Sequence, residues 1–404
     1  MPRFRIGSVF GIPIQLDLTF LLVLPLFAWI IGAQIGETVT ILNEIWGTTL
    51  PSDTLSTGNI RWVLGLSSAV GLFVGVILHE LGHSLVAIRY GYPISSITLW
   101  LFGGIAQLDE MPEDWKHELF IALAGPAVSV ALGVISYVAF IFMPRSGGLA
   151  LASVTFLLGY LALMNVALAI FNMLPGFPMD GGRVLRALLA RNRPYARATK
   201  IAAEVGKIFA IMLGLFGLFV SGNLFLVAIA FFIYIGASGE AQMTAMKAAF
   251  EGVQVQDVMT PADRIQSVDA KLSVSELVEL MFRERHTGYP VERHGELVGL
   301  VTLDDARAVR EVERDAYRVE EIMTTNLETV EHTADAMDAM MRIERNDIGY
   351  LLVYDGEEFV GILTRSDLMT ALNIIQSSGE FQYAPKRSEA GAGGGMTKEF
   401  DRPD

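Results

Sequence analysis

The chain has 404 residues, of which 52% are hydrophobic, and its formal net charge at pH 7 is −14. This composition is too apolar for an ordinary soluble protein, and the length exceeds that of one typical domain. The chain contains no cysteine, which excludes disulfides and thiolate ligands, so any metal must be held by His, Asp or Glu.

The negative charge lies almost wholly in the C-terminal part of the chain. Residues 251–404 hold 31 acidic against 16 basic side chains, net −15, whereas residues 1–250 hold 13 against 14, net +1. An acidic part of this size argues against nucleic acid as a partner. We therefore expect a polytopic α-helical membrane domain in residues 1–240, a linker at 241–253 and a soluble α+β part after it.

The N-terminal segment is expected to form a small β element before the first span. Residues 4–17 contain two glycines and a proline, which disfavour a helix and predict a short strand or a hairpin at the membrane surface. The first span is expected from Leu18 to Ala33, followed by a polar loop from Gln34 to Arg61. The apolar run has no clear small-residue cleavage site, so a cleavable signal is not expected.

The second span carries a metal-binding pattern. From Trp62 to Ile88 the only charged residue is Glu80, so this stretch is long and apolar enough to cross a bilayer. Glu80 lies in the pentad HELGH, between His79 and His83. Two histidines four positions apart share one helix face and can hold one Zn²⁺, while the glutamate acts as the general base of a hydrolase. Ionisable residues at membrane depth are costly, which favours a functional site over a chance pentad.

The segment after this span is expected to be a β-hairpin. Residues 94–108 are rich in β-branched and aromatic residues around the pair Gly103 and Gly104, which predicts strand, tight turn and strand near the membrane. Non-helical backbone at that depth must have its polar groups satisfied by protein or water. The exposed edge of such a hairpin would suit an extended peptide. A plain surface hairpin without a ligand fits the sequence equally well.

Two further spans are expected at 119–143 and 149–171, and a broken segment follows them. Its sequence, NMLPGFPMDGG, holds two prolines and three glycines, which prevent a regular helix and place Asp180 on a loop. A catalytic zinc takes three protein ligands, and Asp180 is the carboxylate best placed to join the two histidines. The alternative is that Asp180 only forms an Asp-Gly turn. Asn172 is expected either to hydrogen-bond the substrate backbone or to cap a helix end.

The last two spans are expected at about 201–220 and 223–235, after a cationic segment. Six spans place both termini on the same side of the membrane. The loops on that side carry most of the basic residues: Arg3, Arg5, Arg89, Lys116, Arg183, Arg186, Arg191, Arg193, Arg197 and Lys200, against Arg61 and Arg145 opposite. By the positive-inside rule we expect the N-terminus and the soluble part to be cytoplasmic. Asp180 and the end of the span that carries the pentad then lie on that side.

The soluble part contains an internal repeat. We expect two copies, at 254–312 and 313–376, each with the order strand, helix, strand, strand, helix, and a disordered tail at 377–404. Three residues of the first copy recur 62 positions later in the second: Gly299, Thr302 and Asp305 correspond to Gly361, Thr364 and Asp367.

The two motifs in the membrane part resemble those of the site-2 protease family of intramembrane zinc metalloproteases. That family pairs HExxH on a transmembrane helix with an Asn-x-x-Pro…Asp-Gly motif, and the resemblance covers about residues 7–240. It implies one Zn²⁺ per chain held by His79, His83 and Asp180, with Glu80 as the base. It also implies that the 94–108 stretch corresponds to the membrane-associated strands near the family's active site.

The repeated part resembles a tandem CBS pair, or Bateman module. In the family pattern, residues that match Thr302, Asp305, Thr364 and Asp367 contact the ribose of adenine nucleotides such as ATP or AMP. The alternative is that Thr and Asp only cap the last helix of each repeat. Because CBS pairs often associate, a homodimer through this pair is plausible.

The favoured hypothesis is a multi-pass cell-membrane endoprotease that cleaves the transmembrane segment of a single-span or other membrane protein and is regulated by its CBS pair. Two alternatives remain open. A CBS-gated transporter or channel would use the His and Asp residues as an ion path. A zinc-binding sensor would hold the metal without catalysis.

Overall fold

The computed structural model describes residues 3–100, 103–108, 112, 114–144 and 147–377. The chain divides into two compact units, Met1–Thr244 and Ala245–Asp404, and each is described by itself. The stretch expected to be a linker, 241–253, is helical as far as Ala249. Of the tail that is expected to be disordered, 377–404, only Ser377 is among the described residues.

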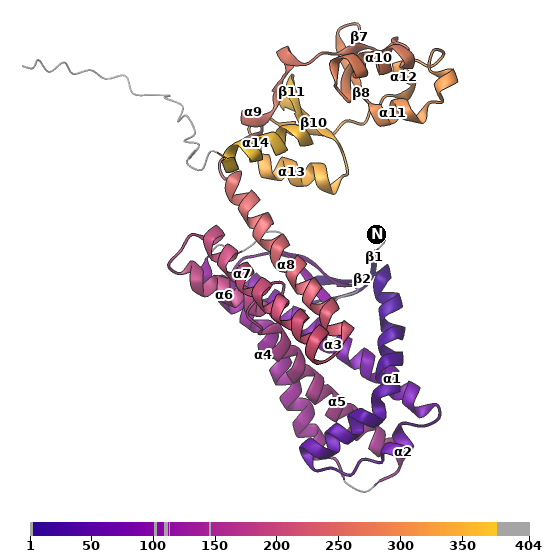
Figure 1. Ribbon diagram of the computed structural model, residues 1–404, viewed down its shortest axis with the longest axis vertical. Coiled ribbons are helices and arrows are strands. Elements are labelled where there is room, and N and C mark those ends of the chain that lie inside the picture. The colour runs from indigo at the N-terminus through magenta and orange to yellow at the C-terminus, as the bar shows by residue number, and fades with distance from the viewer. Residues whose placement is uncertain (1–2, 101–102, 109–111, 113, 145–146, 378–404) are drawn as a thin grey trace, which may run out of the picture. The chain divides into compact units, whose positions relative to one another are not determined.

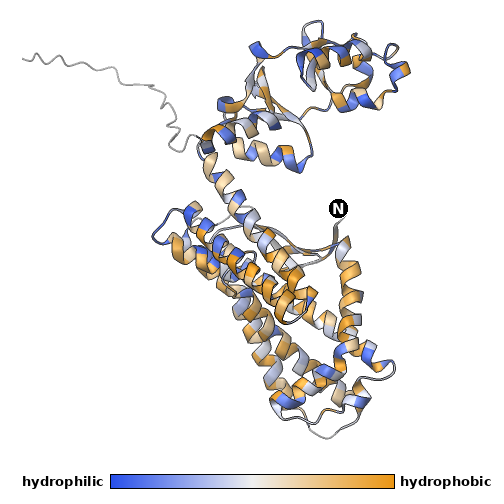
Figure 2. Ribbon diagram, viewed as in Figure 1, coloured by the Kyte–Doolittle hydropathy of each residue, from blue (hydrophilic) through white to orange (hydrophobic). Residues whose placement is uncertain are grey.

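Within the described residues, the first unit has six helices that are long and apolar enough to cross a membrane (Figure 1). Figure 2 shows hydrophobic residues along these helices, and many large apolar side chains on them are exposed, as expected for surfaces that face lipid. The six are α1 (Leu18–Trp46), α3 (Ile60–Arg89), α4 (Trp115–Ile141), α5 (Leu149–Asn172), α7 (Tyr195–Leu215, extended by the π-helical turn Phe216–Val220) and α8 (Leu224–Ala249).

Helix α1 is longer than its sequence predicts. The polar loop expected from Gln34 begins only after Trp46, because Ile35, Val39 and Leu42 recur at helical spacing and are fully buried. Gly47 then ends the helix in the left-handed conformation, with φ of 62°. A short helix, α2 (Ser52–Leu55), lies in the remaining loop.

Both predicted β elements of the membrane unit are present, and together they form one sheet. The N-terminal hairpin is β1 (Arg3–Val9) and β2 (Ile12–Asp17), and the second is β3 (Ile94–Trp100) and β4 (Gly103–Leu108). The order is β1-β2-β3-β4, because β2 pairs in parallel with β3. The sheet therefore joins the start of the chain to the segment that follows α3.

The second unit has the predicted order of elements in each repeat. The first repeat contains β6 (Val268–Asp269), α10 (Val274–Glu284), β7 (Gly288–Arg293), β8 (Glu296–Thr302) and α11 (Leu303–Ala308). The second contains β9 (Thr329–Glu331), α13 (Ala336–Arg345), β10 (Tyr350–Asp355), β11 (Glu358–Thr364) and α14 (Arg365–Ser377). Shorter elements precede them: α9 (Val255–Val258), β5 (Thr260–Pro261) and α12 (Val319–Ile322).

The two repeats are connected through their sheets and a shared core. Strand β5, from the start of the first repeat, pairs with β11 of the second, and Thr324 bridges back to Leu300 on β8. Leu300 also lies in one apolar cluster with Leu352 and Ile362 of the second repeat. Neither repeat therefore buries its apolar surface alone, which agrees with a tandem pair.

Candidate metal centre

The two pentad histidines lie together on a buried face of α3. His79 is 3% exposed and His83 is 4% exposed, and their Nε2 atoms are 3.2 Å apart. Helix α4 approaches this face closely at Gly125, where a Cβ would lie 2.1 Å from His83 Nε2. Only glycine leaves room there for the imidazoles.

The second nitrogen of each ring has its own partner on α4. His83 Nδ1 donates to the carbonyl oxygen of Ile121 at 2.6 Å, which leaves the Nε2 lone pair of His83 free to bind a cation. His79 Nδ1 is 2.9 Å from Ser129 Oγ. Partners of this kind fix the tautomer and orientation of metal-binding histidines. The sequence analysis did not identify Ser129, since a serine in an apolar span gives no signal of its own.

Asp180 completes the cluster, but it does not lie on a loop. It is the first residue of α6 (Asp180–Ala190), and its Oδ2 lies 3.1 Å from the Nε2 atoms of both His79 and His83. The glycines after it allow close packing: a Cβ at Gly181 would lie 2.2 Å from the carbonyl oxygen of Leu174. The helix can therefore begin directly beside the preceding turn.

The two neighbouring imidazoles favour the ionised form of Asp180. Burial acts to raise the pKa of Asp180, but its contacts with the His79 and His83 imidazoles outweigh this effect and hold the pKa below its usual value. An ionised carboxylate beside two imidazoles is a suitable set of ligands for a divalent cation.

The geometry of the three donor atoms fits zinc. With bonds of about 2.0–2.1 Å, tetrahedral ligands of Zn²⁺ lie roughly 3.3 Å from one another. The three donor atoms here are 3.1, 3.1 and 3.2 Å apart. A search of the described residues for groups of three or more His, Cys, Asp or Glu side chains that could hold a metal ion finds this cluster. Three lone-pair atoms at this separation repel one another unless a cation lies among them.

Glu80 lies beside this cluster and against the sheet. It is partly exposed, and a Cβ at Gly104 on β4 would lie 2.6 Å from Glu80 Cγ. The backbone of β4 therefore passes directly beside the expected base. This agrees with the expectation that the 94–108 hairpin lies near the site.

Asn172 is the last residue of α5. Its Nδ2 donates to the carbonyl oxygen of Leu168 at 3.1 Å, within its own helix. This bond lies near the C-terminal end of α5 and does not reach the cluster. A role of Asn172 toward substrate thus stays a prediction.

In the second unit, Thr302 and Thr364 both act as helix N-caps. The hydroxyl of Thr302 donates to Asp305 Oδ2 at 2.6 Å, and the Thr302 backbone donates to the same oxygen at 2.8 Å. Thr364 and Asp367 repeat this arrangement at 2.7 and 2.9 Å. The capping role of these four residues is therefore present, whereas nucleotide contact stays a prediction.

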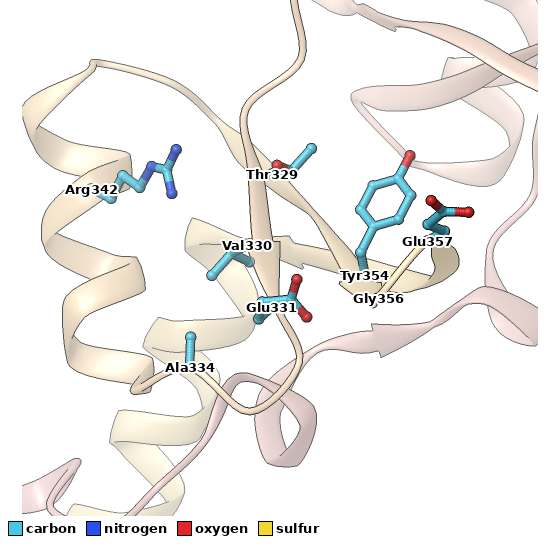
Figure 3. A pocket seen from close by; sticks show the side chains of 8 residues that line it. All are labelled: Thr329, Val330, Glu331, Ala334, Arg342, Tyr354, Gly356 and Glu357. Carbon is cyan, nitrogen blue, oxygen red and sulfur yellow. The ribbon is translucent and has the colours of Figure 1, made fainter.

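A pocket of about 620 Å³ lies elsewhere in the second repeat. Figure 3 shows Arg342 of α13 on one side of it and Tyr354 and Glu357 on the other. Its lining contains none of the four Thr and Asp residues predicted to contact a nucleotide.

These features define a hydrolase-type zinc site on a membrane-length helix, and sequence comparison places the chain in a family. The model of peptidase family M50 matches residues 67–146 and 140–213, and that of the CBS domain matches 255–311 and 319–374. A zinc metalloprotease of Methanocaldococcus jannaschii is 32% identical over 94% of this chain and 98% of its own length. The chain therefore belongs to peptidase family M50, the site-2 proteases, with a C-terminal pair of CBS domains.

The chain is also similar to another curated protein and to solved structures. Rip3 of Mycobacterium tuberculosis, provisionally named as a zinc metalloprotease, is 31% identical over 92% of this chain and 93% of its own length. The solved site-2 protease from M. jannaschii is 35% identical, covers 59% of this chain and 95% of that one, and has a TM-score of 0.40. The solved CBSX2 protein in complex with AMP is 28% identical, covers 30% of this chain and 98% of that one, and has a TM-score of 0.28.

Proposed function

We propose that this zinc metalloprotease hydrolyses peptide bonds within or near the transmembrane segments of other membrane proteins. The observation that carries the proposal is the His79, His83 and Asp180 cluster, because its two histidines and Glu80 lie on α3, a helix of membrane-spanning length. A site at that depth is accessible to substrates in the bilayer.

The residues divide the chemistry between them. The ligands of Zn²⁺ would be His79, His83 and Asp180. When bound, the metal would act as a Lewis acid that polarises a carbonyl group and lowers the pKa of water. Glu80 accepts the proton of the attacking water and passes it to the leaving amine. Asn172 is proposed to hydrogen-bond the substrate backbone near the scissile bond.

Substrate is proposed to bind as an added strand. A peptide bond inside a helix is shielded by the helix, so the substrate must unwind before attack. Within the described sheet, β4 pairs on one side with β3 and is an edge strand, and its Gly104 lies against Glu80. A segment that pairs with β4 would therefore be extended beside the base.

The orientation and regulation of the protein are also proposals. The distribution of basic residues supports a cytoplasmic N-terminus and a cytoplasmic CBS pair. The matched CBS models, and the equivalent Thr and Asp residues in both repeats, support regulation by an adenine nucleotide. Calorimetric titration of the full-length protein with ATP and with AMP tests the nucleotide binding that this regulation requires, and an absence of heat with both nucleotides would contradict it.

Co-expression with candidate single-span membrane proteins tests the protease proposal. The Glu80→Gln variant should keep bound zinc but lose cleavage, because it retains the ligands and removes the base. Undiminished cleavage by this variant would contradict the mechanism. Stoichiometric zinc in the wild type without cleavage of any substrate would favour a sensor over a protease.

A further inference from the structure

Helix α6 must be held accurately, because it carries the third zinc ligand. It has 11 residues, from Asp180 to Ala190, and a helix of that length is marginal without tertiary contacts. A metal site tolerates displacements of only about 0.5 Å in its ligands. Some contact must therefore fix both the depth and the rotation of α6.

Arg186 provides such a contact from the same helix. It is 1% exposed, although in sequence it belongs to a cationic segment that we expected in a loop on the side of the two termini. It lies six residues after Asp180, on a different side of α6 because six residues turn a helix by about 240°. Contacts of Arg186 therefore restrain the rotation of α6 on a different side of the helix from the contacts of Asp180.

The guanidinium group of Arg186 pairs with two carboxylates on two other helices. Arg186 Nε donates to Glu118 Oε1 on α4 at 2.6 Å, and Nη2 lies 2.5 Å from the same oxygen. Arg186 Nη1 donates to Glu240 Oε1 on α8 at 2.5 Å. The side chain of Glu118 is 4% exposed and that of Glu240 is 31% exposed. The charge of Arg186 is therefore compensated where water has little access.

Two aromatic rings also hold the guanidinium group. Its central carbon lies 4.8 Å from the ring centroid of Phe177, in the turn before α6, and 4.8 Å from that of Tyr195, at the start of α7. The planar guanidinium can make these stacking contacts and its forked hydrogen bonds together, which a lysine ammonium cannot. Arg186 thus connects α6 to α4, α7, α8 and the preceding turn.

We propose that Arg186 is a positioning residue for the zinc site, and that Glu118 and Glu240 are its partners. It holds α6 at the depth and rotation at which Asp180 Oδ2 meets the Nε2 atoms of both histidines. Glu118 lies on α4, which also carries Ser129 and the Ile121 carbonyl. One ion-pair network therefore ties the Asp180 ligand to the helix that orients the two histidine ligands. This inference rests on the proposed zinc-dependent function.

The test is zinc binding by full-length Arg186→Lys in detergent, measured by competition with a chelator. Lysine keeps the charge but loses the fork, so we expect at least a tenfold weaker zinc affinity and an altered visible spectrum of the Co²⁺-substituted protein. With a cleavable substrate, kcat should fall while KM stays within twofold. The matched control is Arg193→Lys, since Arg193 is exposed in the turn after α6, and it should leave all these values unchanged.

Glu240→Gln provides a second variant that keeps the shape of the side chain and the contact between Arg186 and Glu118. It should weaken zinc binding by a smaller factor than Arg186→Lys does. If Arg186→Lys does not fold, the zinc affinity of Glu240→Gln tests the proposal by itself. Wild-type zinc affinity and an unchanged Co²⁺ spectrum in the folded variants would overturn the positioning role. A wild-type protein that binds no zinc would instead contradict the proposed function.

Discussion

Gly125 on α4 lies directly against the imidazole of His83 on α3, so that a Cβ at position 125 would lie 2.1 Å from His83 Nε2 and 2.7 Å from His79 Nε2. The space needed by both ligands thus depends on the absence of one side chain on a neighbouring helix. This relationship makes Gly125 as necessary to the site as the ligands themselves.

The Gly125→Ala variant should lose zinc while the protein remains inserted in the membrane. The added methyl group must displace one imidazole or separate α3 from α4, and either movement breaks the ligand geometry. Metal content of the purified protein checks this prediction. Gly239→Ala on α8 is the control, because a Cβ there meets nothing within 4 Å; one zinc per chain in both variants would show that the contact has no effect on the site.

The Gly104→Ala variant should separate catalysis from metal binding. A Cβ at Gly104 would lie 2.6 Å from Glu80 Cγ, so it should push the base away from its position while the three ligands stay in place. We expect kcat to fall by at least about tenfold, because a displaced general base loses part of its contribution to the rate. The zinc content should stay unchanged. Gly7→Ala is a matched control in β1 of the same sheet, where a Cβ has open space. Equal kcat in the two variants would contradict a role for β4 in placing Glu80.

The Ser129→Ala variant tests the orientation of His79. Removal of Ser129 Oγ leaves His79 Nδ1 without its partner at 2.9 Å, and loss of such a partner costs about 10–100-fold in metal affinity. Competition with a chelator measures the change. Ser238→Ala serves for comparison, because the Ser238 hydroxyl bonds to Tyr234 of its own helix, α8; a similar zinc affinity in both variants would mean that Ser129 does not orient the ligand.

The Thr364→Ala variant should loosen the start of α14. The Thr364 hydroxyl satisfies the backbone N–H of Asp367 at 3.1 Å, and loss of an N-cap of this kind costs about 1 kcal/mol, or roughly fivefold in a local equilibrium. Hydrogen exchange of the full-length protein should therefore quicken by about fivefold at the first amides of α14. Thr364→Ser keeps the hydroxyl and should exchange like the wild type; fast exchange in Thr364→Ser would assign the effect to the lost methyl group.

Local patterns in the sequence were sufficient to predict much of this protein. The six spans follow from apolar length, the shared face of His79 and His83 follows from their spacing on a helix, and the repeat of Thr302 and Asp305 follows from a fixed period. Each of these signals involves residues close in the chain or a direct recurrence. The lengths of two spans are exceptions. Helix α1 continues to Trp46 because burial of Ile35 and Val39 outweighs the polar residues of its second half, and α8 continues to Ala249 instead of ending at about residue 235.

Only the tertiary structure decided how these parts combine. Asp180 is a candidate ligand in the sequence, but its position at the start of α6 depends on glycine contacts with the preceding turn. Arg186 is one cation among several in the sequence, and it becomes a buried ion-pair centre because α4 and α8 bring Glu118 and Glu240 to it. These partners lie 54 to 68 residues away along the chain. Contacts at that separation leave no local period. The sequence therefore determined the candidate ligands of the metal, and the packing of the helices determined what holds them in place.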